Sequence, residues 1–307
     1  MRFLAGQISI GASKHIDEIR DKLDAEFQLL KAEGFTVSLD ENEMGEFTFL
    51  GCNLINPDVY SQYTPEEINL IFRHYIGNVL SELIITDWEK HLISKLVKEQ
   101  YNYFNEDERH QIACRAYRNL NHGELKEFSV HRLNRKTRVL QKILEYLDKN
   151  NELVIDGFVK FRLKEYMSEL QDAVDTAVDE FLMEKEYNEF IRLLRYFVEI
   201  QEPRVTLVHV VINSNGVFQL FDGENKPVNS DYLDGFTLET NEAEINYEDL
   251  LISALISLAP KMIILHLSGA VGFSEAVTTI KKVFGGRVTT CPGCEKYSHS
   301  QQGQQDG

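Results

Sequence analysis

The sequence predicts an α+β protein, in which a predominantly helical middle region is flanked by a small N-terminal α/β element and a C-terminal mixed α/β domain. The first observation is the placement of the prolines, because none occurs between Pro65 and Pro203 and that stretch contains only three glycines. An interior Pro costs a helix about 3 kcal/mol and an interior Gly about 1 kcal/mol. The second observation is that β-branched strand patterns are confined to the two flanks.

The N-terminal element has the pattern of a strand, a helix and two further strands. Residues 2–10, 35–39 and 46–55 carry strand patterns, and an amphipathic segment over residues 16–32 lies between the first two. We therefore expect a small βαββ arrangement.

The helical middle region begins with a clear start signal. Thr64 can cap a helix N-terminus, Pro65 suits the first helical position, and Glu66 and Glu67 favour the positive end of the helix dipole. Two or three helices are expected from residue 66 to about 120. A break at residues 121–123 precedes a helix over residues 130–147.

Two more helices are expected before Pro203. The first runs from about residue 156 to 184, because apolar residues recur there at alternating spacings of four and three. That buried seam consists of Leu163, Met167, Leu170, Val174, Ala177 and Phe181. The second helix covers residues 187–200. Its expected buried face consists of Phe190, Leu193, Leu194, Phe197 and Ile200.

The C-terminal region alternates strands and helices, which indicates a small α/β sheet. The expected strands cover 204–212, 217–221, 262–267 and 287–290, with helices at 247–258 and 274–284. The predicted division is therefore a small α/β element at 1–56, an all-helical region at 57–203, a C-terminal α/β domain at 204–297 and a disordered polar tail at 298–307.

Charge and hydropathy limit the classes of function. The chain has 49 acidic and 32 basic side chains, a net charge of -17, so its whole surface is unsuited to coating nucleic acid or anionic membrane. The apolar stretch 250–273 contains Pro260, Lys261 and His266 near its middle, which argues against a membrane span. The first residues lack a secretory apolar core, so a cytoplasmic location is expected.

One helix departs from the overall acidity. Residues 128–144 contain no acid but several cations with a helical spacing that places them on one exposed stripe. These candidate binding residues are Arg132, Arg135, Lys136, Arg138 and Lys142. The stripe is a candidate site for phosphate, of nucleic acid or of another acidic partner. The alternative is neutralisation within the protein, since nine acids lie between residues 165 and 189.

The cysteines suggest a metal site rather than a disulfide framework. There are only four of them, and Cys291 and Cys294 have the C-x-x-C spacing of zinc and dithiol sites. No supporting helix follows this motif, which disfavours a redox role. With His299, the two cysteines supply three candidate zinc ligands, and Cys52, Cys114, His266 or another subunit would provide a fourth. The alternative is a simple Pro-Gly turn.

No motif identifies a reaction or a complete cofactor site. The glycines of residues 269–274 lie between an expected strand and helix, where a nucleotide phosphate can meet helix N-terminal amides, but an ordinary turn fits as well. Nucleophile elbow, zinc-protease and dinucleotide motifs are missing from the sequence. A non-enzymatic role is therefore favoured.

Several segments carry a family resemblance. They are Glu189–Arg204 (EFIRLLRYFVEIQEPR), His131–Arg135 (HRLNR), Gly157–Leu163 (GFVKFRL) and Cys291–Cys294 (CPGC). Together they resemble the YtxC-like family of sporulation proteins of endospore-forming Firmicutes, over about residues 60–295. The resemblance implies a cytoplasmic role in or near sporulation, and it brings no catalytic residues with it.

Two functional hypotheses follow. In the first, the chain is a non-enzymatic binding or regulatory factor that uses the basic helix at 130–147 to bind a protein partner, with local binding of nucleic acid or phosphate as a variant. In the second, it is a nucleotide- or metal-binding α/β enzyme whose site lies at the 269–274 turn or at the C-terminal CPGC motif.

Overall fold

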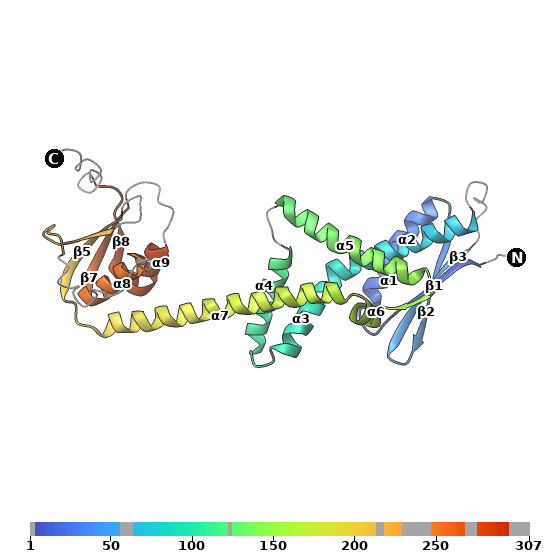
Figure 1. Ribbon diagram of the computed structural model, residues 1–307, viewed down its shortest axis with the longest axis horizontal. Helices are drawn as coiled ribbons and strands as arrows, with labels where there is room; N and C mark the ends of the chain where they lie inside the picture. The colour runs from blue at the N-terminus through green and yellow to red at the C-terminus, as the bar shows by residue number, and fades with distance from the viewer. Residues whose placement is uncertain are drawn as a thin grey trace, which may run out of the picture. The chain divides into compact units, whose positions relative to one another are not determined.

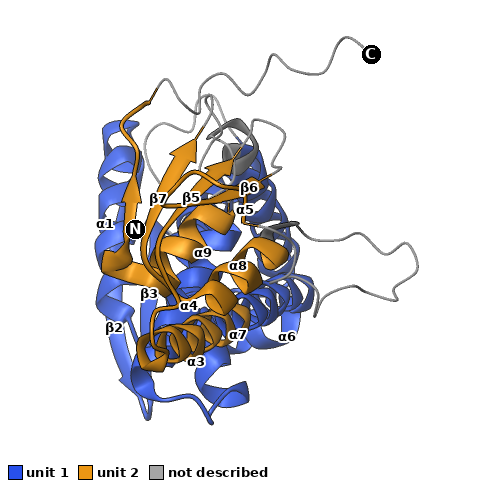
Figure 2. Ribbon diagram, turned by 90° about the vertical axis from the view of Figure 1, so that its left-hand side faces the viewer, with its two compact units in different colours: residues 1–182 blue, residues 183–307 orange. Residues whose placement is uncertain are grey.

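A computed structural model describes residues 4–55, 64–121, 125–212, 218–228, 247–267 and 275–294 of the chain. The chain divides into two compact units, residues 1–182 and 183–307 (Figure 2). The predicted α+β class is confirmed, with helices in the middle of the chain and strands toward its two ends. The strands form two separate four-stranded sheets, one in each unit (Figure 1).

The sheet of unit 1 confirms the predicted βαββ element and adds a strand to it. β1 (Leu4–Ala12) and β2 (Thr36–Met44) both pair antiparallel with β3 (Phe47–Ile55), and α1 (Ile16–Ala32) connects β1 to β2. β4 (Glu152–Val154) pairs parallel with β1, giving the order β2-β3-β1-β4. The three residues of β4 lie in the region that the sequence predicts as helical. A strand this short leaves no measurable alternation in the sequence.

The helical region of unit 1 begins where the sequence predicts, at Thr64 and Pro65. Thr64 and Glu67 form a reciprocal capping box at the start of α2 (Pro65–Leu83). A π-helical segment, η1 (Ile84–Trp88), connects α2 to α3 (Glu89–Gln100). They are followed by α4 (Glu106–Asn121) and α5 (Leu125–Leu147). The predicted break at 121–123 lies largely outside the described residues.

The last helices of this region differ from the prediction. Instead of two helices at 156–184 and 187–200, the chain forms a short α6 (Ile155–Arg162) and a continuous α7 (Lys164–Ile200). The break falls at Leu163, whose φ of -101° and ψ of 44° leave the helical region. No Gly or Pro interrupts residues 184–186, so nothing stops the helix there.

The two predicted apolar faces of α7 had different outcomes. The seam from Leu163 to Phe181 is buried as predicted, with Met167 partly exposed. The face predicted for residues 187–200 is wrong, because Ile191 and Val198 are the buried residues there. The exposed ones are Phe190, Leu193, Phe197 and Ile200, and Leu194 is half-buried. Apolar side chains surround most of this part of the helix, so periodicity alone does not select the face that packs.

Unit 2 confirms the predicted order of strands and helices after residue 204. β5 (Val205–Ile212) pairs antiparallel with β6 (Phe218–Asp222) and parallel with β7 (Pro260–Leu267), which pairs parallel with β8 (Val288–Thr290). Its helices are α8 (Tyr247–Leu258) and α9 (Glu275–Phe284), followed by the 3-10 turn η4 (Gly285–Arg287). The core combines both helices, β5, β7 and the last turns of α7.

Among the helices of the described residues, none has the length and apolarity that a membrane crossing requires.

A substitution at Gly77 tests how closely α2 packs against α5. A Cβ at residue 77 would lie 3.1 Å from Leu140 Cδ1 and 3.2 Å from Leu144 Cδ2, whereas a Cβ at Gly157 on α6 would meet nothing within 4 Å. We expect Gly77→Val to lower the free energy of unfolding by about 1–3 kcal/mol through overpacking. Gly157→Ala should raise it by about 0.4–1 kcal/mol. Denaturant unfolding would measure both, and equal effects would contradict this packing.

Candidate functional site

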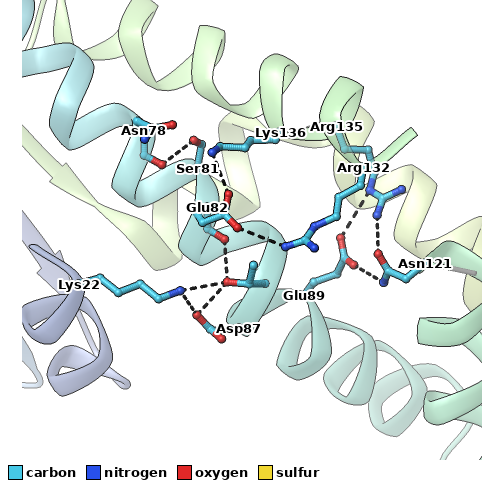
Figure 3. Close-up of polar contacts among 11 residues, drawn as sticks. Lys22, Asn78, Ser81, Glu82, Asp87, Glu89, Asn121, Arg132, Arg135 and Lys136 are labelled. Atoms are coloured by element: carbon cyan, nitrogen blue, oxygen red, sulfur yellow. Dashed lines mark hydrogen bonds and ion pairs between the residues drawn. The ribbon is translucent and has the colours of Figure 1, made fainter. Parts of the chain in front are cut away.

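The cations of the predicted basic helix, α5, form ion pairs with carboxylates of the same protein. Arg132 Nη2 lies 3.2 Å from Glu82 Oε1, and Lys136 Nζ lies 2.8 Å from Glu82 Oε2 (Figure 3). Glu82 is a residue of α2, so these ion pairs connect α2 to α5. Glu82 therefore neutralises Arg132 and Lys136, and it does not belong to the acidic segment 165–189 that the sequence suggested.

The other two exposed cations of α5 are also paired. Arg138 Nη2 donates to Glu169 Oε2 at 2.9 Å, and Lys142 Nζ lies 3.1 Å from Glu145 Oε2. Glu169 does belong to the acidic segment at 165–189, so the predicted internal neutralisation describes Arg138. About half of the Arg138 and Lys142 side-chain surface remains exposed, with 50% and 51% accessible. These pairs are open to solvent and weak.

Arg135 is not part of an exposed stripe, and that prediction is wrong. Its side chain is only 5% exposed, because it points to the C-terminal end of α4 and to Glu89 of α3 instead of to solvent. Arg135 Nη2 donates to Asn121 Oδ1 at 2.9 Å and Nη1 donates to the Leu120 carbonyl at 3.2 Å. A helical wheel assumes one buried face, whereas this helix has partners on several sides.

Glu89 is the counter-charge of Arg135, and no pattern in the sequence pointed to it. The carboxylate is fully buried at the start of α3, and its Oε2 lies 3.6 Å from Arg135 Nε (Figure 3). Asn121 Nδ2 donates to it at 2.7 Å, and the Tyr166 hydroxyl donates at 3.1 Å. Burial raises the pKa of Glu89 above its ordinary value, although these partners oppose the shift.

The structure also reveals a cleft that includes the end of this basic helix. A cavity of about 710 Å³ lies between the second half of α5 and the residues of α6 and early α7. Six cations but only two carboxylates line it, together with several aromatic rings. The cations are Arg135, Arg138, Lys142, Lys149, Arg162 and Lys164, and the carboxylates are Glu145 and Glu165. This group is called the cationic cleft below.

Three of the cleft cations were not predicted. Lys149, Arg162 and Lys164 are exposed and form no ion pair within the described part of the chain. Arg162 instead lies over the Tyr146 ring, with its guanidinium carbon 5.7 Å from the ring centroid. They come from the end of α5 and the junction of α6 with α7, so only the folded chain brings them beside Lys142.

A second cluster lies in unit 2, at the C-terminal ends of β7 and β8. A ring nitrogen of His266 and the sulfurs of Cys291 and Cys294 all lie within 4.8 Å of one another. His266 is buried, and the two cysteines are half-buried. Burial, followed by the neighbouring His209, lowers the pKa of His266, which favours a neutral imidazole.

The other predicted site residues have different positions or are not described. Cys52 is buried in the core of unit 1, where burial raises the pKa of its thiol to about 12. Cys114 is exposed on α4. His299 and the 269–274 turn lie outside the described residues. The Pro-Gly turn of the CPGC motif is present, with a positive φ of 123° at Gly293.

These features define a class of protein with a mixed α+β fold, a buried ion pair among its helices and a cation-lined cleft. The chain belongs to the YtxC-like family, whose family model matches residues 74–289. It is 30% identical over 208 residues to the uncharacterized protein YtxC of Bacillus subtilis (strain 168), a match that covers 66% of this chain and 71% of that protein. No solved structure is significantly similar to the chain.

Replacing Arg135 tests the buried ion pair. Arg135→Ala leaves Glu89 buried without its counter-charge, so we expect the free energy of unfolding to fall by about 3–5 kcal/mol. Arg138→Ala, on the same helix, removes only a half-exposed pair and should cost less than about 1 kcal/mol. Urea unfolding of both variants measures the difference. Similar losses would show that Glu89 does not depend on Arg135.

The raised pKa of Glu89 predicts a pH dependence of stability. A carboxyl whose folded pKa lies above its unfolded value stabilises the fold below the unfolded pKa and loses that contribution as pH rises through the folded pKa. The stability of the natural protein relative to Glu89→Gln should therefore decline as pH rises from about 4 toward 7. Unfolding at several pH values measures this, and a relative stability that increases with pH would contradict the assignment.

Proposed function

We propose that this protein is a cytoplasmic, sporulation-associated binding factor without enzymatic activity, and that it binds an acidic partner at the cationic cleft. The observation that carries the proposal is the charge of the cleft lining, in which six cations face two carboxylates although the chain as a whole has a net charge of -17. A local concentration of cations in an acidic protein favours anions at that place. The sporulation role is the expectation that accompanies the family.

The geometry supports a partner with grouped negative charges. Lys149, Arg162 and Lys164 have no carboxylate partner within the described residues, so they are available to an anion. Arg138 and Lys142 are half-exposed and pair with carboxylates that are 33% and 65% exposed, which an incoming anion can displace at little cost. Tyr146 and Phe161 add apolar surface beside these charges. This combination suits a phosphorylated or acidic protein segment, which presents charge and side-chain surface together.

Arg135 has a different role in this proposal. Arg135 lines the cleft, but its guanidinium donates to Leu120 and Asn121 and pairs with Glu89. Its role is therefore to hold the helices together. Charge reversal at Arg135 would disrupt the helices themselves. The test therefore uses cleft cations that have no structural partner.

The experiment measures binding of a fluorescent oligo-glutamate peptide and of a matched phosphopeptide by anisotropy. Lys149→Glu/Lys164→Glu should weaken binding by about tenfold or more and reduce its salt dependence, because two cationic contacts are reversed. The control is Lys95→Glu/Lys98→Glu, an equal charge change on exposed residues of α3 away from the cleft lining.

Three results would overturn the proposal. They are absence of binding by the natural protein, equal losses in the two double variants, and retention of full affinity by Lys149→Glu/Lys164→Glu. Far-ultraviolet circular dichroism would verify that both double variants are folded. A labelled single-stranded oligonucleotide is measured in the same way. If it binds more tightly than both peptides and its binding depends on the same cations, the partner is nucleic acid and not a protein.

A further inference from the structure

We propose that His266, Cys291 and Cys294 bind a zinc ion in unit 2. The three candidate donor atoms lie within 4.8 Å of one another. Two cysteine sulfurs and one imidazole nitrogen are donors that zinc prefers, and they occur together in tetrahedral zinc sites. This inference is independent of the cationic cleft, which belongs to unit 1.

The spacing of the donors fits zinc. Zinc–sulfur and zinc–nitrogen bonds of about 2.3 and 2.0 Å, at a tetrahedral angle, place the two donor atoms about 3.5 Å apart. Cys294 Sγ lies 3.4 Å from His266 Nδ1. This pair therefore has nearly the separation that a shared zinc ion requires, and the Cys291 sulfur lies within 4.8 Å of the Cys294 sulfur and of a His266 ring nitrogen.

The backbone holds the two cysteines in place. The Cys291 N–H donates to the Leu265 carbonyl at 2.9 Å, which extends the pairing of β8 with β7 and fixes Cys291 beside His266. Pro292 then restricts φ, and Gly293 adopts a φ of 123° that other residues rarely reach. The turn returns Cys294 toward His266. The same Pro-Gly turn thus closes the strand and brings the second sulfur into the site.

His209 positions the imidazole of His266. Its Nδ1 lies 2.9 Å from His266 Nε2, on the neighbouring strand β5. A zinc ion on His266 Nδ1 needs the lone pair of that nitrogen, so the proton must be on Nε2 and is donated to His209. A partner on the second ring nitrogen is the usual arrangement around zinc-binding histidines. His209 is therefore a positioning residue.

Binding at this site would release protons and leave no net charge. Each cysteine binds as a thiolate, so one zinc ion replaces two thiol protons, and the two thiolates neutralise the dication. The neutral His266 contributes no charge. Three donors occupy three of the four tetrahedral positions, and a water molecule can complete the coordination.

Metal analysis of purified protein gives the first test. We expect one zinc per chain in protein prepared without chelator, and background zinc in Cys291→Ser/Cys294→Ser. Cys114→Ser is the matched control, because that exposed cysteine belongs to no described donor cluster. Full zinc in the double variant, or its loss in Cys114→Ser, would overturn the assignment.

A second test uses the unsubstituted protein, so its result does not depend on whether a cysteine variant folds. Chelated protein is treated with a thiol alkylator with and without added zinc, and the modified cysteines are identified by mass spectrometry. Zinc should protect Cys291 and Cys294 but not Cys114, and cobalt should give a thiolate charge-transfer absorption. The chelated protein is kept reduced before alkylation, and equal alkylation of Cys291 and Cys294 with and without zinc would overturn the proposal.

His209→Ala tests the positioning role separately. It leaves all three donors in place, so cobalt should still give the thiolate absorption while zinc affinity falls by about 10–100-fold. Unchanged zinc affinity in a competition titration would show that His209 does not orient the ligand.

Discussion

Four helices of unit 1 meet at one buried ion pair, between Arg135 and Glu89. Its hydrogen-bonding partners Asn121 and Tyr166 come from two further helices, so α3, α4, α5 and α7 all contribute to one polar cluster. A buried charge without its partner is strongly unfavourable, so the cluster permits few other arrangements of these helices. Glu89 is the first residue of α3 and directly follows the π-helical segment η1, which lies between α2 and α3.

The same constraint shapes the cationic cleft. With Arg135 committed to the interior, the rest of α5 presents Arg138 and Lys142 to solvent beside the junction of α6 and α7. The break at Leu163 places Arg162 and Lys164 at that junction. The cationic cleft therefore lies next to the buried ion pair, and it combines the solvent-exposed pairs of Arg138 and Lys142 with the exposed cations Arg162 and Lys164.

Unit 2 organises its chemistry in a different way. His266 lies near the end of β7 and Cys291 directly follows β8, so strand pairing rather than a buried charge determines their spacing. Parallel strands place residues distant in sequence at the same sheet edge. His209, His266 and Cys294 are brought together in this way although long stretches of sequence separate them.

Local pattern and similarity along the chain were enough to predict the α+β class, the helix start at Thr64, the seam from Leu163 to Phe181, and the family. The burial of Arg135, the face of α7 that packs in unit 2, and the meeting of His266 with Cys291 and Cys294 became visible only in the folded chain. A helical wheel fixes which residues share a face, but the number of neighbours that cover a helix is a property of the whole fold. Non-local strand pairing likewise leaves no periodic signal in the sequence.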